Sequence, residues 1–354
     1  MAHRDPPGSP GRLLGLSNIR RFKADSLEFI TDLGREFGDI AHFRLGPIRA
    51  YLVNNPELIR EVLVTKARHF RKQPRTLNAL RQIDGNGLIV SEGDFWLQQR
   101  RLVQPAFHPR RFTRYAELSV EYTRRMLADW QSGAVIDIAD AMTRLTLAII
   151  ARTLFDVELS GQASQLGEAV HVLSETMVRE LSSLFALPDW IPTESKRRKR
   201  WAISTLRMMI EEIIRERRAK QEDRGDLLSM LLLATDAEGD GRRMTDRQAA
   251  DEAMTLFNAG HDSTAAALAW IWYLIASHPE VEAKLVEEAH GTLGSRSATY
   301  EDVARLAYTE RVVKEALRLY PPTWAMLPRE VITPVELGGY LLPRGGNVYY
   351  SVYC

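Results

Sequence analysis

The spacing of apolar and polar residues predicts a mainly α-helical chain. Apolar positions recur every three or four residues in long pieces between 93 and 235, and again over about 280–290 and 301–319. This period matches the turn of an amphipathic helix. Proline and glycine separate the pieces, as they do at helix ends. The fold class we expect is mainly α with a small β portion.

A smaller part of the chain has the composition of strands. The runs 40–45 and 48–53 lie on either side of a Gly-Pro pair, which predicts a hairpin. Short apolar runs between glycines and prolines return in the final part of the sequence, so we expect both chain ends to supply strands. Asn55 has the position of an N-cap for a helix over 56–70. We expect residues 72–91 to form a loop.

One long helix is expected over 247–277, which contains the most apolar stretch of the chain. It has no proline, and Pro279 follows it. Thr245 and Gln248 have the spacing of a capping box at its start. The apolar run 265–276 is too short to span a bilayer and is typical of a buried helix.

The middle of this helix carries residues that weaken a helix. Gly260 costs about 1 kcal/mol relative to alanine, and Ser263 and Thr264 can bond back to carbonyls one turn earlier. Asp262 beside Ser263 could relay protons to a site on this helix face. The same residues could belong to a kinked core helix whose polar groups find partners nearby. The residue types alone favour neither interpretation.

The overall composition is that of an ordinary globular protein. Of 354 residues, 45% are hydrophobic and 26% charged, and the net charge of +1 gives no field for nucleic acid or a membrane surface. The proline-rich start has no apolar signal segment, and no transmembrane anchor is expected. The single cysteine, Cys354, excludes an internal disulfide framework. We expect a cytoplasmic protein with a flexible segment over 1–18 and a single domain over 19–354.

Two residue pairs are further candidates for binding or structure. Trp96 and Arg100 lie one helical turn apart and could bind a flat, anionic ligand. An amphipathic helix, however, often carries such a pair with the arginine stem along its apolar surface. Glu315 and Arg318 have the spacing of a helix ion pair, which recurs elsewhere in the chain. Only the Tyr-Pro-Pro that follows distinguishes this pair from the others.

Two Glu-x-x-His pairs suggest an alternative metal site. A ferritin-like di-iron site needs two such pairs on separate helices, together with a glutamate from each of two others. Glu168/His171 and Glu287/His290 have that spacing, but charged or small residues adjoin both pairs, which favours surface positions. We therefore predict no metal site from these residues.

Taken in order, the motifs resemble those of the cytochrome P450 family of haem-thiolate monooxygenases. They are Trp96-x-x-x-Arg100, Ala259-Gly-His-Asp-Ser-Thr264, Glu315-x-x-Arg318 with Tyr-Pro-Pro, Pro328-Arg329 and Gly339-Tyr-Leu-Leu-Pro-Arg-Gly345. The likeness covers essentially the whole chain. It implies the fold of that family, haem b as cofactor, and insertion of one oxygen atom of O2 into a hydrophobic small molecule such as a fatty acid or terpenoid. It also implies a separate electron donor, a ferredoxin or flavodoxin with its reductase.

The resemblance implies that five positions bind the cofactor. Arg100, with Trp96 beside it, and Arg329 would contact the haem propionates. Ala259 and Gly260 would lie over the haem, where small residues leave room for dioxygen.

The resemblance also implies catalytic and structural positions. Asp262, Ser263 and Thr264 would guide protons to the reacting oxygen. The family usually has threonine at the position of Ser263, and serine keeps the hydroxyl but lacks the methyl group that restricts its rotamer. Glu315 and Arg318 would be structural.

One part of the family pattern is absent. The haem-binding segment Phe-x-x-Gly-x-Arg-x-Cys-x-Gly is not found, and Cys354 follows a strand-like run instead of a glycine-rich loop. We therefore reject Cys354 as the iron ligand. We expect the sequence to be a C-terminally truncated fragment that is inactive in this form. The alternative is a non-catalytic helical remnant that binds apolar ligands or a partner without haem.

Overall fold

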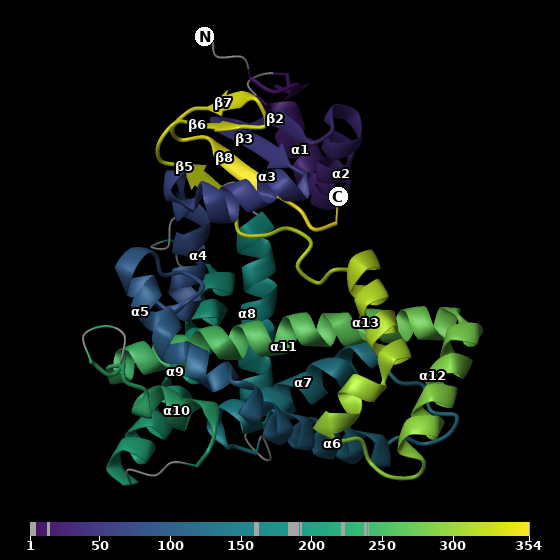
Figure 1. Ribbon diagram of the computed structural model, residues 1–354. Coiled ribbons are helices and arrows are strands. Elements are labelled where there is room, and N and C mark those ends of the chain that lie inside the picture. Colours follow the sequence, from purple (N-terminus) through teal and green to yellow (C-terminus); the bar gives the residue numbers. More distant parts are fainter. Residues whose placement is uncertain are drawn as a thin grey trace. The chain divides into compact units, whose positions relative to one another are not determined.

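The computed structural model describes residues 5–12, 15–158, 163–182, 191, 193–220, 224–236, 239 and 241–353. The chain forms two compact units (Figure 1). The first comprises Met1–Gln82, Glu175–Lys196 and Thr323–Cys354, and the second comprises Ile83–Ser174 and Arg197–Pro322. Strands lie in the first unit and most of the helices in the second, which confirms a mainly α fold with a small β portion.

The first unit is built on a six-stranded sheet with strand order β1-β2-β3-β8-β5-β4. The strands are β1 Gly8–Ser9, β2 Ile40–Leu45, β3 Ile48–Val53, β4 Phe70–Lys72, β5 Arg329–Val331 and β8 Asn347–Tyr350, and β6 Val335–Leu337 pairs separately with β7 Tyr340–Leu342. The predicted hairpin is present, since β2 and β3 pair antiparallel. β8 runs parallel to β3, so both chain ends build the sheet, as expected. The segment 1–18, expected to be flexible, contributes β1 and the start of helix α1.

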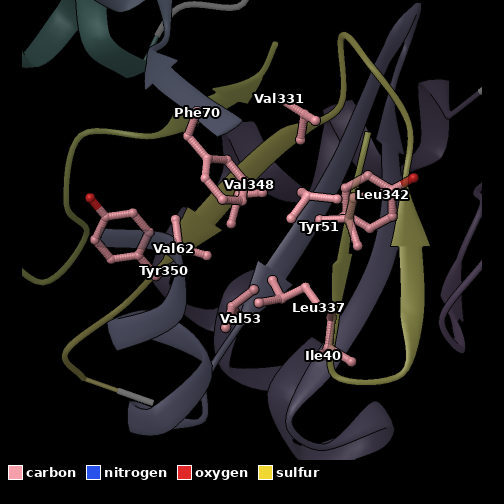
Figure 2. Close-up of a cluster of buried hydrophobic side chains, with 11 residues drawn as sticks. Ile40, Tyr51, Val53, Val62, Phe70, Val331, Leu337, Leu342, Val348 and Tyr350 are labelled. Atoms are coloured by element: carbon pink, nitrogen blue, oxygen red, sulfur yellow. The ribbon is translucent and has the colours of Figure 1, made fainter. Parts of the chain in front are cut away.

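One face of this sheet carries a buried apolar cluster (Figure 2). Tyr51 and Val53 of β3 point to the same face because side chains alternate along a strand, and both are fully buried. Val348 of β8 and Leu342 of β7 belong to the same cluster. Each such side chain stabilises the fold by roughly 1.5–3 kcal/mol relative to an exposed position.

Two helices pack with a second apolar cluster of the sheet. They are α1 Leu16–Ala24 and α2 Ser26–Phe37, and Asp25 caps α2 by accepting a hydrogen bond from the backbone of Glu28. Phe29 of α2 meets Phe43 of β2 edge to face, with ring centroids 5.6 Å apart. The first unit therefore has apolar packing around its sheet that uses residues from both chain ends.

The expected helix over 56–70 is correct only at its start. Asn55 is the N-cap, because its side chain accepts hydrogen bonds from the next turn of backbone. The helix α3 ends at Arg60, and a π-helical turn η1 (Glu61–Thr65) and a 3-10 turn η2 (Ala67–His69) follow. Phe70 pairs with Val331 of β5 instead of continuing the helix, because tertiary strand pairing overrides local propensity.

The expected loop over 72–91 was wrong, since residues Pro74–Asp84 form helix α4. Proline is favoured in the first turn of a helix. Leu77, Leu80 and Ile83 follow at helical spacing and are all buried. That spacing was visible in the sequence, so the helix could have been predicted.

The second unit is helical. Its elements are α5 Gly93–Val103, η3 Gln104–Phe107, η4 Pro109–Arg111, α6 Phe112–Ala128, α7 Ile138–Phe155, most of α8 Ala163–Ser182, most of α9 Glu194–Lys220, α10 Leu227–Leu233, α11 Asp246–Ser277, α12 Pro279–Leu293, η5 Tyr300–Arg305 and α13 Ala307–Leu319. The long helix α11, green in Figure 1, packs along α7. No helix within the described ranges is long and apolar enough to cross a membrane.

Helix α11 has the ends that the sequence predicts. Thr245 and Gln248 form the capping box, and the helix ends at Ser277, two residues before Pro279. Near its C-terminal end, Trp270 stacks on Tyr320, with ring centroids 4.3 Å apart and planes inclined by 9°. This stack joins the end of α13 to α11 within the second unit.

Candidate functional site

The centre of α11 changes from buried to exposed over a few residues. Most side chains from Ala249 to Asn258 are buried, whereas Ala259, Asp262 and Ser263 are exposed. These three lie at positions i, i+3 and i+4 and so share one helix face. An acid and an alcohol therefore lie beside a small residue on an accessible face, directly after the buried first half of the helix.

Both hydroxyl groups of this stretch bond to their own helix. Ser263 Oγ donates to the carbonyl oxygen of Ala259 at 3.0 Å, and Thr264 Oγ1 donates to that of Gly260 at 2.9 Å. Such bonds to the carbonyl one turn earlier satisfy a hydroxyl without a partner from another element. Thr264 is exposed as well.

Gly260 permits a close approach of α7. A Cβ atom at this position would lie 2.6 Å from Cδ1 of Ile150, so the isoleucine would have to move. The glycine is therefore explained by helix packing within the second unit, independently of any ligand.

His261 is buried between the exposed residues. Its Nδ1 lies 3.0 Å from the carbonyl oxygen of Phe257, and its ring packs on the Phe257 ring at 5.5 Å between centroids. Its Nε2 lies 3.7 Å from Oδ1 of Asp262. The sequence motif includes this histidine, but we assigned it no role.

Helix α5 carries the predicted aromatic–arginine pair. The Arg100 guanidinium lies over the Trp96 ring, 5.2 Å from its centroid. Arg100 is exposed, and no carboxylate of a described residue pairs with it. A guanidinium held against an indole in this way can accept an anion in a fixed orientation.

A neighbouring ion pair, which sequence reasoning missed, fixes the same helix. Arg101 Nε and Nη2 donate to the two carboxylate oxygens of Asp236, each at 2.7 Å, and the Asp236 side chain is almost fully buried. Two parallel hydrogen bonds hold a guanidinium and a carboxylate in one geometry. The pair joins α5 to the turn closed by the bridge between Thr235 and Arg243.

The buried first half of α11 binds the segment after α4 through its carboxylates. Asp251 accepts hydrogen bonds from the backbone N–H of Asn86 at 2.9 Å and from Arg207 at 3.0 Å. Glu252 accepts one from the backbone N–H of Leu88 at 3.0 Å. Two adjacent acids of one helix thus hold the backbone of one loop.

Glycine is required at two positions of that loop. Gly85 has φ +64°, and a Cβ there would lie 2.1 Å from Oδ1 of Asp251. A Cβ at Gly87 would lie 2.1 Å from the Thr255 hydroxyl oxygen. Both glycines let the loop backbone reach the polar face of α11, which consists of Asp251, Thr255 and the following Asn258 at helical spacing.

Asp84, at the end of α4, is the most perturbed acid of this region. Burial raises its pKa to about 6, and the nearby charge of Asp251 also raises it, whereas a hydrogen bond from Asn258 and the charge of Arg207 lower it. No local pattern predicted the raised pKa of Asp84, because its partner Asn258 lies 174 residues away along the chain.

The other residues that the sequence singled out lie outside helices α5 and α11. Glu315 and Arg318 form a two-bond ion pair on α13, at 2.6 and 2.8 Å, and both side chains are exposed. Arg318 lowers the pKa of Glu315 by donating to it. Arg329 lies in the first unit, at the start of β5, and donates to the carbonyl oxygen of Leu327 at 3.2 Å. Cys354 lies outside the described residues.

The alternative di-iron site does not form. Glu168, His171, Glu287 and His290 are all exposed, as the sequence predicted. Across the described part of the chain, no group of three or more histidine, cysteine, aspartate or glutamate side chains is arranged to hold a metal ion.

The sequence profile of the cytochrome P450 family matches residues 6–354. The chain is 37% identical over 346 residues to cyclooctat-9-en-7-ol 5-monooxygenase of Streptomyces melanosporofaciens, covering 97% of this chain and 74% of that protein. It is 38% identical over 347 residues to cyclooctatin synthase of the same organism, covering 98% and 75%. It is 32% identical over 346 residues to pentalenene oxygenase of Streptomyces avermitilis, covering 97% and 75%. The chain belongs to the cytochrome P450 family.

Membership of the cytochrome P450 family confirms the predicted class of enzyme. This P450 is an oxidoreductase of the haem monooxygenase class, which uses O2, a hydrophobic small molecule and redox partners. The roles that we assigned to individual residues stay predictions. So does the inactivity of the chain in this form, which depends on Cys354.

The described residues fit the periphery of a haem. Arg100 offers an exposed cation without a carboxylate partner among the described residues, held by Trp96, and this suits a propionate. Ala259 adds no side chain beyond Cβ to the accessible face of α11. The thiolate that this family places on iron has no counterpart among the described residues, because the chain has one cysteine and it lies outside them.

Proposed function

We propose that the substrate of this P450 is a terpenoid. Two similar proteins are named cyclooctat-9-en-7-ol 5-monooxygenase and pentalenene oxygenase, and both align over nearly the whole of this chain. The observation that carries the proposal is the accessible face of α11. It places an acid and a hydroxyl beside a small residue, directly after the buried first half of the helix.

Two arginine side chains of this chain supply the proposed contacts with the haem propionates. Arg100, oriented by Trp96, binds one propionate, and Arg329 binds the other. Ala259 and Gly260 leave space next to the helix. When bound, the haem supplies the activation of dioxygen, and the protein supplies orientation and protons.

The proposed proton path begins at Asp262. Its side chain is half exposed, so it exchanges protons with solvent. Ser263 lies next to it on the same accessible face, and its hydroxyl can accept a hydrogen bond there while its own hydrogen points to the carbonyl oxygen of Ala259. Thr264 donates a hydrogen bond to the carbonyl oxygen of Gly260, one turn earlier in the helix.

The loop after α4 gives an apolar contact for the substrate. Leu88 and Ile89 are half-buried, and Glu252 of α11 fixes the loop backbone at Leu88. A terpenoid has little to offer for hydrogen bonding, so shape and apolar area determine how it binds. Electrons come from a separate ferredoxin or flavodoxin with its reductase. We place the protein in the cytoplasm.

Calorimetric titration of the purified chain with pentalenene tests the substrate class, with a saturated fatty acid as the competing ligand. We expect pentalenene to bind, and Ala259→Trp to abolish binding by filling the accessible face. The matched control is Ala276→Trp, which adds the same side chain at an exposed position on the same helix. Equal binding by both variants, or preference for the fatty acid, contradicts the proposal.

The same preparation tests the chemistry. Haem b, a ferredoxin, its reductase, NADPH and isotopically labelled dioxygen are added, and the product is examined for one labelled oxygen atom. Our rejection of Cys354 as the iron ligand predicts no haem-thiolate absorption band after reduction under carbon monoxide. Such a band would show that the rejection was wrong. Failure to take up haem at all would favour the non-catalytic alternative.

A further inference from the structure

His261 is the buried titratable group closest to the proposed proton path. The residue is 2% exposed. Its Nδ1 lies 3.0 Å from the carbonyl oxygen of Phe257, one turn earlier on α11. A carbonyl oxygen only accepts, so Nδ1 carries a hydrogen and donates it. In the neutral ring, this leaves Nε2 with a lone pair and no hydrogen.

Nε2 lacks a hydrogen-bond partner among the described residues, although it is buried. A buried nitrogen in this state is destabilising unless some group satisfies it. The carboxylate next to the ring is that of Asp262, with Oδ1 at 3.7 Å from Nε2. Residues adjacent in a helix normally point apart, so this approach is unusual.

The ring is fixed, whereas the carboxyl group can move. Phe257 packs against the His261 ring and is itself packed against Phe155 of α7. The Asp262 side chain is half exposed, so a rotation can bring Oδ1 into hydrogen-bond range. After that rotation, the carboxyl oxygen and Nε2 attract each other when one proton lies between them.

Several charged groups on the elements that pack against α11 are paired with other residues. These pairs are Arg152 with Asp156 at the end of α7, Arg217 with Asp226 at the N-cap of α10, Glu288 of α12 with the backbone of Tyr308 and Thr309, Lys314 with Glu310 of α13, and Arg318 with Glu315 of α13. α7 presents apolar groups to this part of α11, namely Phe155 and Ile150.

We propose that His261 is a positioning residue whose Nε2 holds the carboxyl group of Asp262 by sharing one proton with it. The proton moves between Oδ1 and Nε2, and no bond between heavy atoms forms or breaks. When Asp262 gives a proton to an acceptor on the accessible face, solvent replaces it through the exposed side of the carboxyl group. The inference deepens the proposed function, because it rests on Asp262 as the proton donor.

The test is the ¹⁵N spectrum of histidine-labelled chain at neutral pH, with the His261 signals assigned by their loss in His261→Gln. We expect Nε2 of the native chain to show the shift of a hydrogen-bonded nitrogen. Asp262→Ala should move it to the value of a free, unprotonated nitrogen, and Asp262→Glu should restore it. Because Asp262 is half exposed, these substitutions leave the fold in place.

His278 is the internal control. It makes the same Nδ1 contact one turn back, at 2.8 Å to the carbonyl oxygen of Leu274, and no described carboxylate pairs with it. Its signals should be the same in every variant. Identical Nε2 shifts for His261 in the native and Asp262→Ala chains, or no restoration by Asp262→Glu, would overturn the proposal. The spectra need neither haem nor substrate, so their outcome is independent of the pentalenene experiments.

Discussion

Asn258 Nδ2 donates a hydrogen bond of 2.7 Å to Oδ1 of Asp84, although 174 residues separate them along the chain. Both side chains are buried. The bond joins the end of α4 to the polar face of α11, directly before the accessible centre of that helix. It therefore connects the loop proposed to contact substrate to the helix proposed to supply protons.

The raised pKa of Asp84 predicts a pH-dependent stability. Its pKa is about 6 in the folded chain, against 3.8 for an ordinary aspartate, so the folded state binds the proton more tightly. The free energy of unfolding should consequently fall as pH rises between these two values, by roughly 3 kcal/mol at most, and this contribution should be constant above them. Urea unfolding at several pH values between these two measures the slope of the free energy of unfolding against pH.

Asp84→Asn should remove this slope, because an amide does not titrate and can still bond to Asn258. Asp94→Asn, in the exposed first turn of α5, is the control and should keep it. A slope that persists unchanged in Asp84→Asn would assign the effect to another group.

Gly85→Ala should destabilise the second unit far more than a strained φ alone explains. Gly85 and Gly133 both have positive φ, at 64° and 82°, but a Cβ at Gly133 meets nothing within 4 Å, whereas one at Gly85 meets the Asp251 carboxylate. We expect Gly85→Ala to cost about 2 kcal/mol more than Gly133→Ala. Urea midpoints of the two variants give the comparison, and equal midpoints would mean that the loop is not held against α11.

Arg100→Ala should weaken haem binding. A charged hydrogen bond contributes about 1.5–3 kcal/mol, so Kd should rise about 10-fold to 100-fold. Titration with haem b, followed by absorption, measures it. Arg144→Ala removes an exposed arginine of α7 that pairs with Asp140 and should leave Kd unchanged. Equal affinities in the two variants would exclude Arg100 as a propionate ligand.

Glu315→Gln should leave the free energy of unfolding nearly unchanged in this chain, because both members of its ion pair are exposed to solvent. The buried pair of Arg217 with Asp226 provides the contrast. Asp226→Asn should cost about 3 kcal/mol, since it leaves a buried guanidinium without its counter-charge. Urea unfolding at neutral pH compares the two. A large loss in Glu315→Gln would show a structural role that the exposed geometry does not explain.

Local signals in the sequence were enough to predict α11 and the β2–β3 hairpin. A capping box, the absence of proline and a Gly-Pro turn act within a few residues. The aromatic–arginine contact of Trp96 with Arg100 was predictable for the same reason, because one helical turn brings the two side chains together.

The contacts that fix the loop were not predictable in this way. Asp84 and Asn258 become partners only when α4 and α11 pack together, and neither residue has a distinctive local pattern. The polar face of Asp251, Thr255 and Asn258 at helical spacing was a usable signal. It indicated a buried polar contact but not the loop that makes it.

The bond from Ser263 to the carbonyl oxygen of Ala259 determines which kind of neighbour this helix face accepts. With its hydrogen directed into the helix, the hydroxyl presents only lone pairs outward. A water molecule or protonated group arriving there meets an acceptor, and the serine can donate outward only after leaving the carbonyl. At Ser263 the face therefore accepts hydrogen bonds, and a ligand atom that is only an acceptor can bond to this hydroxyl only after the serine rotates away from the carbonyl.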